Sequence, residues 1–177
     1  LKEKKRPIYF VTKKQFKDWL KSCEILGEEA ELVRDIAKVV LYTAARISEI
    51  LTVNWDQIDL DKRVIKLFDD KDDNISDKTN SGGFLYLNQK ACDILLKYSD
   101  NIPGPFLVNY DWFQWRLRKI AKKTKFRLRP HDIRKTAGCW LVQDGMDIYQ
   151  VSKFMRHTSV TVTEKFYADL MTDQYHN

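Results

Sequence analysis

Residues 130–141 predict a helix with one apolar face, and this helix constrains how the C-terminal half of the chain can fold. Pro130 suits the first turn of a helix, where its missing N–H costs nothing. Apolar residues then recur at helical spacing and form a stripe that must face a core: Ile133, Ala137, Trp140 and Leu141. His131 and Arg134 stand three residues apart, so they share another face of this helix. We therefore expect Arg134 to lie off the core, where its removal would leave the fold intact.

Other residues with useful chemistry lie elsewhere in the chain. Arg46 stands off the apolar stripe of a helix that we expect to continue to residue 51. His157 follows a helix expected after Asp147, and Tyr167 comes ten residues after His157. Paired guanidiniums can neutralise and orient the oxygens of a phosphodiester, imidazoles can hold or move protons, and a phenol can act as a nucleophile. This set of groups predicts attack on a phosphodiester bond.

Each of these residues also has an ordinary structural interpretation. Arg46 could form a salt bridge with Glu49, three residues on. A histidine at the start of a helix, such as His131, often binds backbone. A tyrosine near a C-terminus, such as Tyr167 or the neighbouring Tyr175, usually packs or lies on the surface. What favours the chemical interpretation is the order in which all of these residues occur together.

One set of residues carries a resemblance to a known family: Arg46, His131-x-x-Arg134, His157 and Tyr167. Their order resembles the catalytic domain of the tyrosine recombinases, the phage-integrase family, and the similarity extends from Arg6 to about Leu170. The resemblance implies cleavage and rejoining of DNA through a covalent 3′-phosphotyrosyl link. It also implies that no metal, ATP or other cofactor takes part.

The resemblance assigns a role to each of these residues. Tyr167 would attack the phosphorus, while Arg46 and Arg134 would bind the phosphate oxygens. His131 would take the proton of the phenol, and His157 would donate a hydrogen bond to a phosphate oxygen.

The family also carries a catalytic lysine in a β-hairpin, and Lys78 is the candidate in this chain. Lys78-Thr79 matches the start of the usual Lys-Thr-Gly-Lys, whereas Asn80-Ser-Gly-Gly replaces the rest. Lys71 is the alternative if the hairpin has a different register. The resemblance implies that this lysine protonates the departing 5′-hydroxyl.

Two positions next to the candidate site differ from the family. Ala44-Ala45 precedes Arg46 where the family usually has glycine. Arg156 precedes His157 where the family also usually has glycine, and we expect Arg156 to cap the preceding helix or to contact a phosphate.

Periodicity elsewhere predicts a mainly α fold with a small antiparallel three-stranded sheet, an α+β domain with the tyrosine recombinase catalytic-domain fold. Strand patterns occupy residues 55–60, 63–68 and 84–87. Further helices are expected from the capping box Thr12-x-x-Gln15, over residues 28–43, after Asn88 and from Asp111. Residues 11–177 are then the catalytic domain, and the resemblance makes residues 1–10 a basic linker from a missing N-terminal DNA-binding domain.

The net charge of +6 and the pI of about 9.1 favour a polyanionic partner. With the resemblance, that partner is expected to be double-stranded DNA, bound by a chain that is monomeric in solution and tetrameric on DNA. A basic run is more often a solvated face, but these residues are candidates for phosphate contacts: Lys4, Lys5, Arg6, Arg116, Lys119, Lys122, Lys123, Arg127, Arg129 and Arg156.

Several other classes of protein do not fit the sequence. No apolar run approaches the roughly 18 residues that a membrane-spanning helix needs. Cys23, Cys92 and Cys139 are widely spaced, have no metal-binding pattern with histidine, and indicate free thiols in a reducing compartment. We therefore expect no metal site and a cytoplasmic protein of a prokaryote or mobile element.

Two alternatives to recombination remain open from the sequence. A type IB topoisomerase would use the same chemistry to relax supercoiled DNA. A non-catalytic DNA-binding module could have kept the fold, as the departures at Ala44-Ala45, Gly82-Gly83 and Arg156 would allow.

Overall fold

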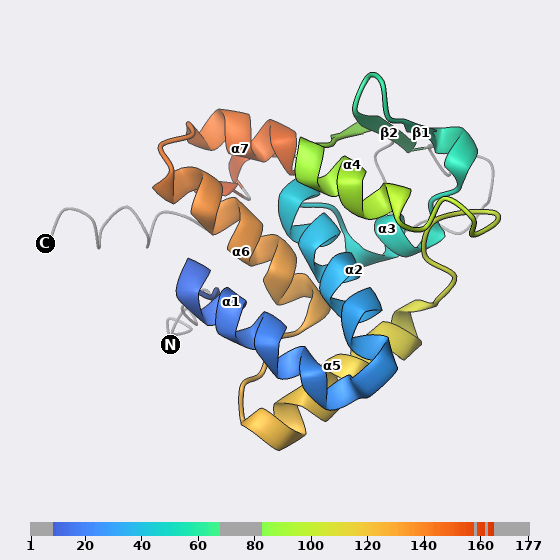
Figure 1. Ribbon diagram of the computed structural model, residues 1–177. Helices are drawn as coiled ribbons and strands as arrows, with labels where there is room; N and C mark the ends of the chain where they lie inside the picture. The colour runs from blue at the N-terminus through green and yellow to red at the C-terminus, as the bar shows by residue number, and fades with distance from the viewer. Residues whose placement is uncertain (1–8, 68–82, 158, 162, 165–177) are drawn as a thin grey trace, which may run out of the picture.

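Helix α2 (Ala30–Thr43) lies at the centre of the fold, where it packs against helices from both halves of the chain. The structure, a computed structural model, describes residues 9–67, 83–157, 159–161 and 163–164 (Figure 1). Val33, Ile36 and Val40 on α2 are completely buried. Their spacing gives α2 the apolar stripe that the sequence predicts, and α4 and α6 contact the same helix.

The predicted capping box at the N-terminus is confirmed. The Gln15 backbone N–H donates to Thr12 Oγ1 at 3.1 Å, and the Thr12 N–H donates to Gln15 Oε1 at 2.8 Å, so α1 (Lys13–Ser22) begins at residue 13. A 3₁₀ segment, η1 (Cys23–Glu29), then leads to α2. The helix expected from residue 28 begins at Ala30 instead, because Gly27 takes a φ of 63° and interrupts the helical backbone.

The three-stranded antiparallel sheet is also confirmed, although the first strand is shorter than predicted and the third begins one residue earlier. Its order is β1 (Ile58–Asp59), β2 (Val64–Leu67) and β3 (Gly83–Tyr86), and Ile65 pairs with Ile58 on one side and Leu85 on the other. The start of the first predicted strand forms a 3₁₀ turn, η2 (Trp55–Gln57).

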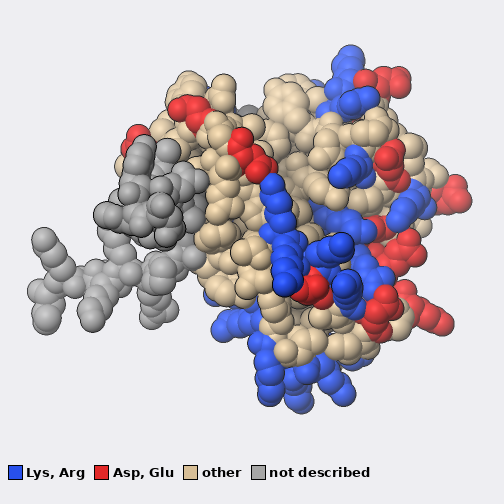
Figure 2. Space-filling view, turned by 60° about the vertical axis from the view of Figure 1, so that its left-hand side comes forward, with Lys and Arg blue, Asp and Glu red and all other residues tan. Residues whose placement is uncertain are grey.

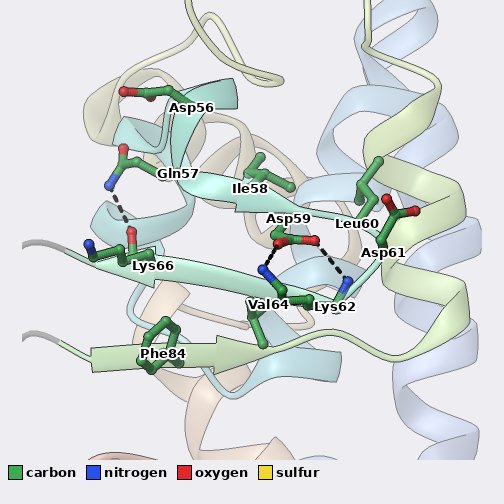
Figure 3. A pocket seen from close by; sticks show the side chains of 10 residues that line it. All are labelled: Asp56, Gln57, Ile58, Asp59, Leu60, Asp61, Lys62, Val64, Lys66 and Phe84. Atoms are coloured by element: carbon green, nitrogen blue, oxygen red, sulfur yellow. Dashed lines mark hydrogen bonds and ion pairs between the residues drawn. The ribbon is translucent and has the colours of Figure 1, made fainter.

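Side-chain hydrogen bonds stabilise the turn between β1 and β2 (Figure 3). The Asp59 carboxylate accepts the backbone N–H of Lys62 at 2.8 Å and pairs with Lys62 Nζ at 3.0 Å. Gln57 Nε2 donates to the Lys66 carbonyl at 3.0 Å, which ties η2 to β2. These contacts border a shallow hollow on the outer face of the sheet.

The remaining helices begin at polar caps. Asn88 caps α4 (Gln89–Leu96) and Asp147 caps α7 (Ile148–Phe154), as expected. Helix α5 (Tyr110–Thr124) begins one residue earlier than predicted, because Asn109 accepts the Trp112 N–H at 2.8 Å. The short α3 (Ile47–Thr52) follows α2, and Figure 1 shows α5 at the opposite end of the molecule from the sheet.

Helix α6 (Pro130–Gln143) packs between α2 and α7. Its predicted stripe is confirmed, since Ile133 and Ala137 are buried and Trp140 and Leu141 pack partly buried against the core. Trp140 Nε1 donates to the Val11 carbonyl at 2.8 Å, so the segment before α1 is attached to α6.

The three cysteines are free, as the sequence predicts, and the structure shows that all three are buried. Burial raises the pKa of the Cys23 thiol to about 11 and that of Cys139 to about 12, so both stay protonated at neutral pH. In the part of the chain that the structure describes, we find no helix long and apolar enough to cross a bilayer. The same residues contain no cluster of histidine, cysteine or carboxylate groups that could hold a metal ion.

Candidate active site

Arg134, in the second turn of α6, connects the ends of two other helices. Its Nη1 donates to the Ala44 carbonyl at 2.7 Å, and its Nη2 donates to the Met155 carbonyl at 2.5 Å. Ala44 is the C-cap of α2, and Met155 is the C-cap of α7. A cation is favourable at these positions because carbonyl groups at helix C-termini carry partial negative charge.

The expectation that Arg134 lies off the core is wrong. The residue is 3% exposed, although it lies outside the apolar stripe of α6. The stripe describes α6 alone, whereas the ends of α2 and α7 bring two carbonyl groups to the face that carries Arg134. Loss of this side chain would therefore remove a charge-assisted hydrogen bond from each of these two carbonyl groups.

Arg46 is positioned by Glu49 at the start of α3. The Glu49 carboxylate accepts the backbone N–H of Arg46 at 2.7 Å and Nη1 of its guanidinium at 2.9 Å. The predicted salt bridge is thus present, but the Arg46 side chain stays 26% exposed and accessible to a ligand. Ala44, where the family usually has glycine, adopts a left-handed φ of 49°, so the turn before Arg46 forms with alanine.

Arg156 contacts the same carboxylate from the end of α7. Its Nη2 donates to Glu49 Oε1 at 2.5 Å, and its side chain is 9% exposed. Burial alone would raise the pKa of Glu49, but the Arg156 and Arg46 guanidiniums outweigh it and lower that pKa. The expectation that Arg156 caps α7 is confirmed by its backbone: it follows the C-cap Met155 with a left-handed φ of 53°, its N–H donates to the Lys153 carbonyl at 3.0 Å, and the His157 N–H donates to the Ser152 carbonyl at 3.0 Å. The alternative, a contact of its side chain with DNA, finds no support in this geometry, because the guanidinium is buried and paired with Glu49.

His157 lies half-buried among positive charges. Its Nδ1 is 2.7 Å from Oγ1 of Thr163, which is completely buried. Burial, followed by the charges of Arg134, Arg46 and His131, lowers the pKa of His157 to about 4. These charges act on His157 because the fold brings the three residues close to it. His157 is therefore neutral at pH 7.

His131 lies exposed at the start of α6, close enough to His157 for its charge to contribute to the lowered pKa of that histidine. Partial desolvation and the positive charges of Lys135 and Arg134 lower the pKa of His131. A neutral imidazole with one ring nitrogen free of a proton can accept a proton from a bound group.

The lowered pKa of His157 predicts a pH dependence of stability. The ordinary pKa is 6.5, so below that pH the unfolded chain binds a proton that the folded site resists until about pH 4. The free energy of unfolding should therefore fall as pH decreases from 6.5 to about 4.5. His157→Asn should reduce this fall, as measured by urea unfolding at both pH values. An undiminished fall in His157→Asn would show that other groups cause it.

The structure brings together four of the predicted catalytic residues: Arg46, His131, Arg134 and His157. The other predicted groups lie outside the described residues: Lys78 with its alternative Lys71, Tyr167, and the basic arm Lys4, Lys5 and Arg6. Sequence reasoning missed Thr163 and the second partner of Glu49. The threonine is not distinguished by any pattern, and the Glu49 pair joins residues that are 107 positions apart.

The candidate DNA-contacting residues of α5 divide into two groups. Arg116 pairs with Glu29 and stacks on Trp112, with 4.1 Å between the guanidinium carbon and the ring centroid, so its charge is already engaged. Exposed cations occupy the rest of the helix and the segment after it: Arg118, Lys119, Lys122, Lys123, Lys125 and Arg127. Arg129 pairs with Asp132 at 2.8 Å and 2.9 Å while remaining half exposed.

These exposed cations border a hollow of about 220 Å³ between α5 and the start of α6, which Arg118, Arg127 and Arg129 line. Figure 2 shows Lys and Arg side chains gathered at the lower end of the molecule, at the level of α5 in Figure 1. Acidic side chains are more frequent on the right of the same view. The positive surface thus continues from α5 toward the N-terminus of α6, which carries His131.

This architecture is that of the tyrosine recombinase catalytic domains. The crystal structure of XerA recombinase matches it with a TM-score of 0.71 at 17% identity, covering 98% of this chain and 67% of that chain. The catalytic domain of bacteriophage HP1 integrase matches with a TM-score of 0.69 at 17% identity, covering 91% of this chain and 88% of that chain.

Sequence comparison leads to the same class. Tyrosine recombinase XerA of Saccharolobus solfataricus is 24% identical over 145 residues, which cover 80% of this chain and 47% of XerA. The integrase of Salmonella phage P22 is 26% identical over 172 residues, which cover 84% of this chain and 43% of that integrase. Residues 9–173 match the phage integrase family, and the chain belongs to that family. It spans less than half the length of these two relatives.

Proposed function

We propose that this chain is the catalytic part of a site-specific DNA recombinase or integrase, which cuts and rejoins double-stranded DNA through a 3′-phosphotyrosyl link. The observation that carries the proposal is the convergence of Arg46, Arg134, His131 and His157 from remote segments, with Arg134 bonded to the ends of α2 and α7. Family membership supports it.

Each positioned group has a task in cleavage. The negatively charged non-bridging oxygens of a phosphodiester repel a nucleophile, and fixed guanidiniums offset that repulsion by stabilising the negative charge on these oxygens during attack. Arg46 is accessible enough to bind an oxygen directly, and Arg134 holds a second positive charge at a fixed position. Because both are fixed before DNA binds, little reorganisation is needed during the reaction.

The two neutral histidines have different roles: His157 donates a hydrogen bond, and His131 accepts a proton. The buried Thr163 hydroxyl faces Nδ1 of His157, and a hydroxyl that donates there leaves the proton on Nε2. His157 then donates a hydrogen bond to a phosphate oxygen. His131, exposed and neutral, accepts the phenol proton of Tyr167. Ionising a phenol with a pKa of about 10 costs about 4 kcal/mol at pH 7, so a base and nearby cations are both useful.

Lys78, with Lys71 as the alternative, is proposed to protonate the departing 5′-hydroxyl. The tyrosyl link keeps the energy of the phosphodiester, so a 5′-hydroxyl from another strand can rejoin the DNA without ATP or a metal ion. The exposed cations of α5 and of residues 125–129 are proposed to bind the DNA backbone, together with Lys4, Lys5 and Arg6.

Solved relatives support DNA as the partner. The Tn1549 transposon integrase, solved in complex with transposon right end DNA, matches this fold with a TM-score of 0.70 at 19% identity. Residues 1–10 are proposed to be a basic linker from a DNA-binding domain. The chain is proposed to be monomeric in solution and to form a tetramer on DNA. The proposed place of action is the cytoplasm of a prokaryotic host.

A nicked suicide substrate tests the function. The nick lets the short strand beyond the cut diffuse away, so a covalent intermediate accumulates. Wild-type protein incubated with a randomised library of nicked duplexes should give a protein–DNA band on a denaturing gel, without added metal. Binding without such a band would favour a non-catalytic module. Relaxation of supercoiled plasmid without strand exchange between duplexes would favour type IB topoisomerase activity.

Contacts to the DNA backbone predict a particular salt dependence. Each phosphate contact adds roughly 0.9 to the slope of log affinity against log salt. The double variant Lys122→Ala with Lys123→Ala should therefore lower the slope by about 1 to 2 and weaken binding to all sequences alike. Lys90→Ala, which removes an exposed charge from α4, is the control and should leave the slope unchanged. Equal slopes for both variants would place the DNA elsewhere.

A further inference from the structure

Glu49 receives hydrogen bonds from two guanidiniums, one only three residues away in the chain and the other 107 residues away. Arg46 Nη1 reaches Oε1 at 2.9 Å, and Arg156 Nη2 reaches the same oxygen at 2.5 Å. The carboxylate is 11% exposed, so water competes little for these bonds. Because Oε2 accepts the Arg46 backbone N–H, both oxygens of Glu49 are engaged and its orientation depends on all three donors.

Arg156 makes this contact from an unfavourable conformation. Its φ is 53°, in the left-handed region that favours glycine, and glycine is the residue that the family usually has at this position. Its Nε and Nη1 are buried without a hydrogen-bond partner. Its stem lies beside the start of β3, where a Cβ added to Gly83 would be 3.9 Å from Cδ of Arg156. Glycine would adopt this left-handed backbone without strain, and it would bury no unpaired donors. Stability alone therefore does not explain why arginine occupies position 156.

The burial of Arg156 also argues against a direct DNA contact. The unpaired nitrogens are inaccessible to solvent, and Nη2 is occupied by Glu49. A backbone phosphate could reach the guanidinium only after the site had rearranged. Arg46, in contrast, is accessible and shares the carboxylate. Arg156 can therefore affect the reaction on DNA only indirectly, by fixing Glu49, which in turn holds Arg46.

We propose that Arg156 is a positioning residue, which fixes Glu49 and thereby holds the Arg46 guanidinium in the orientation that stabilises the charge on the scissile phosphate during cleavage. This inference rests on the proposed cleavage of DNA. It assigns to Arg156 a role in the rate of cleavage and none in binding or in folding.

Arg156→Gly is the informative variant, because glycine adopts the left-handed backbone without strain. We expect cleavage of the suicide substrate at saturating DNA to slow by about tenfold to a hundredfold, the range that a small misplacement of a catalytic group produces. The DNA dissociation constant and its salt slope should stay unchanged, and the melting temperature should stay equal or rise. Arg156→Lys, which can still donate to Glu49, should recover most of the rate.

A double-mutant cycle tests the route through Glu49. If Arg156 acts through that carboxylate, Arg156→Gly should slow cleavage far less in a Glu49→Gln background than in wild type. Equal effects in both backgrounds would overturn the proposal. A salt slope lowered by about 0.9 in Arg156→Gly would also overturn it, in favour of a direct phosphate contact.

The same experiments separate the inference from the proposed function. If wild-type protein forms no covalent band, the proposed function fails before Arg156 is tested. If wild type forms the band and Arg156→Gly cuts at the same rate, the function stands and the inference fails. A large fall in the melting temperature of both Arg156→Gly and Arg156→Lys would make the residue structural, which also contradicts the proposal.

Discussion

Replacing Arg134 with alanine is expected to abolish covalent DNA cleavage and to lower the free energy of unfolding by about 3 kcal/mol. The guanidinium is 3% exposed and donates charge-assisted hydrogen bonds to the carbonyls of Ala44 and Met155. Without it, both carbonyls are buried and lack these donors, and each costs about 1–3 kcal/mol. Urea unfolding and the suicide-substrate assay measure the two effects separately.

Arg134→Lys separates charge from geometry. A lysine keeps the positive charge, but a single ammonium cannot reproduce the planar fork that reaches two carbonyls at once. We expect its stability to lie between those of wild type and Arg134→Ala, and its cleavage rate to fall at least about a hundredfold. If Arg134→Ala unfolds like wild type, the contacts with α2 and α7 do not stabilise the fold. If Arg134→Lys cuts like wild type, the fork geometry is unnecessary.

Replacing Tyr167 with phenylalanine is expected to eliminate the covalent protein–DNA band completely. Phenylalanine keeps the ring but removes the oxygen that would bond to phosphorus, so no other group can take its place in the link. DNA affinity and melting temperature should match wild type, because the change removes one hydroxyl. The comparison requires equal DNA occupancy, which a gel-shift measurement on the same substrate provides.

Tyr175→Phe is the matched control for Tyr167→Phe. It makes the same chemical change eight residues further along the C-terminal segment, and it should form the band as wild type does. Proteolysis of the covalent complex followed by mass spectrometry should locate the DNA on the peptide that contains Tyr167. A band that persists in Tyr167→Phe and disappears in Tyr175→Phe would reassign the nucleophile.

Local patterns in the sequence were sufficient to predict most of the fold. Thr12, Asn88 and Asp147 cap helices as expected, because capping depends on residues only two or three positions away. Alternation in 55–68 and 84–87 identified the sheet, although Trp55–Gln57 turned into 3₁₀ structure. The start of α2 was misplaced because the backbone at Gly27 decides it, and periodicity does not report on backbone angles.

The partners of charged residues could not be predicted in the same way. Arg116 was expected to face DNA, but it pairs with Glu29, which lies 87 positions earlier in the chain. The backbone of Arg156 caps α7 as expected, but its side chain pairs with Glu49 from a distant helix, which the sequence did not indicate. Arg134 was assigned to an open face of α6, because the sequence of α6 does not show that the ends of α2 and α7 pack against that face in the folded chain. Such pairings depend on the tertiary arrangement, which a helical stripe does not contain.

The acceptors that hold Arg134 are main-chain carbonyls at positions 44 and 155. Every amino acid supplies a carbonyl, so mutations at these two positions leave the acceptors chemically intact as long as the helix ends persist. Arg134 itself has no such freedom, because only arginine provides two forked donors on a long stem. The contact with Arg134 therefore does not restrict the side chains at positions 44 and 155, which are limited instead by burial and, at position 44, by the left-handed backbone. In a library saturating all three positions, residue 134 should tolerate the fewest substitutions.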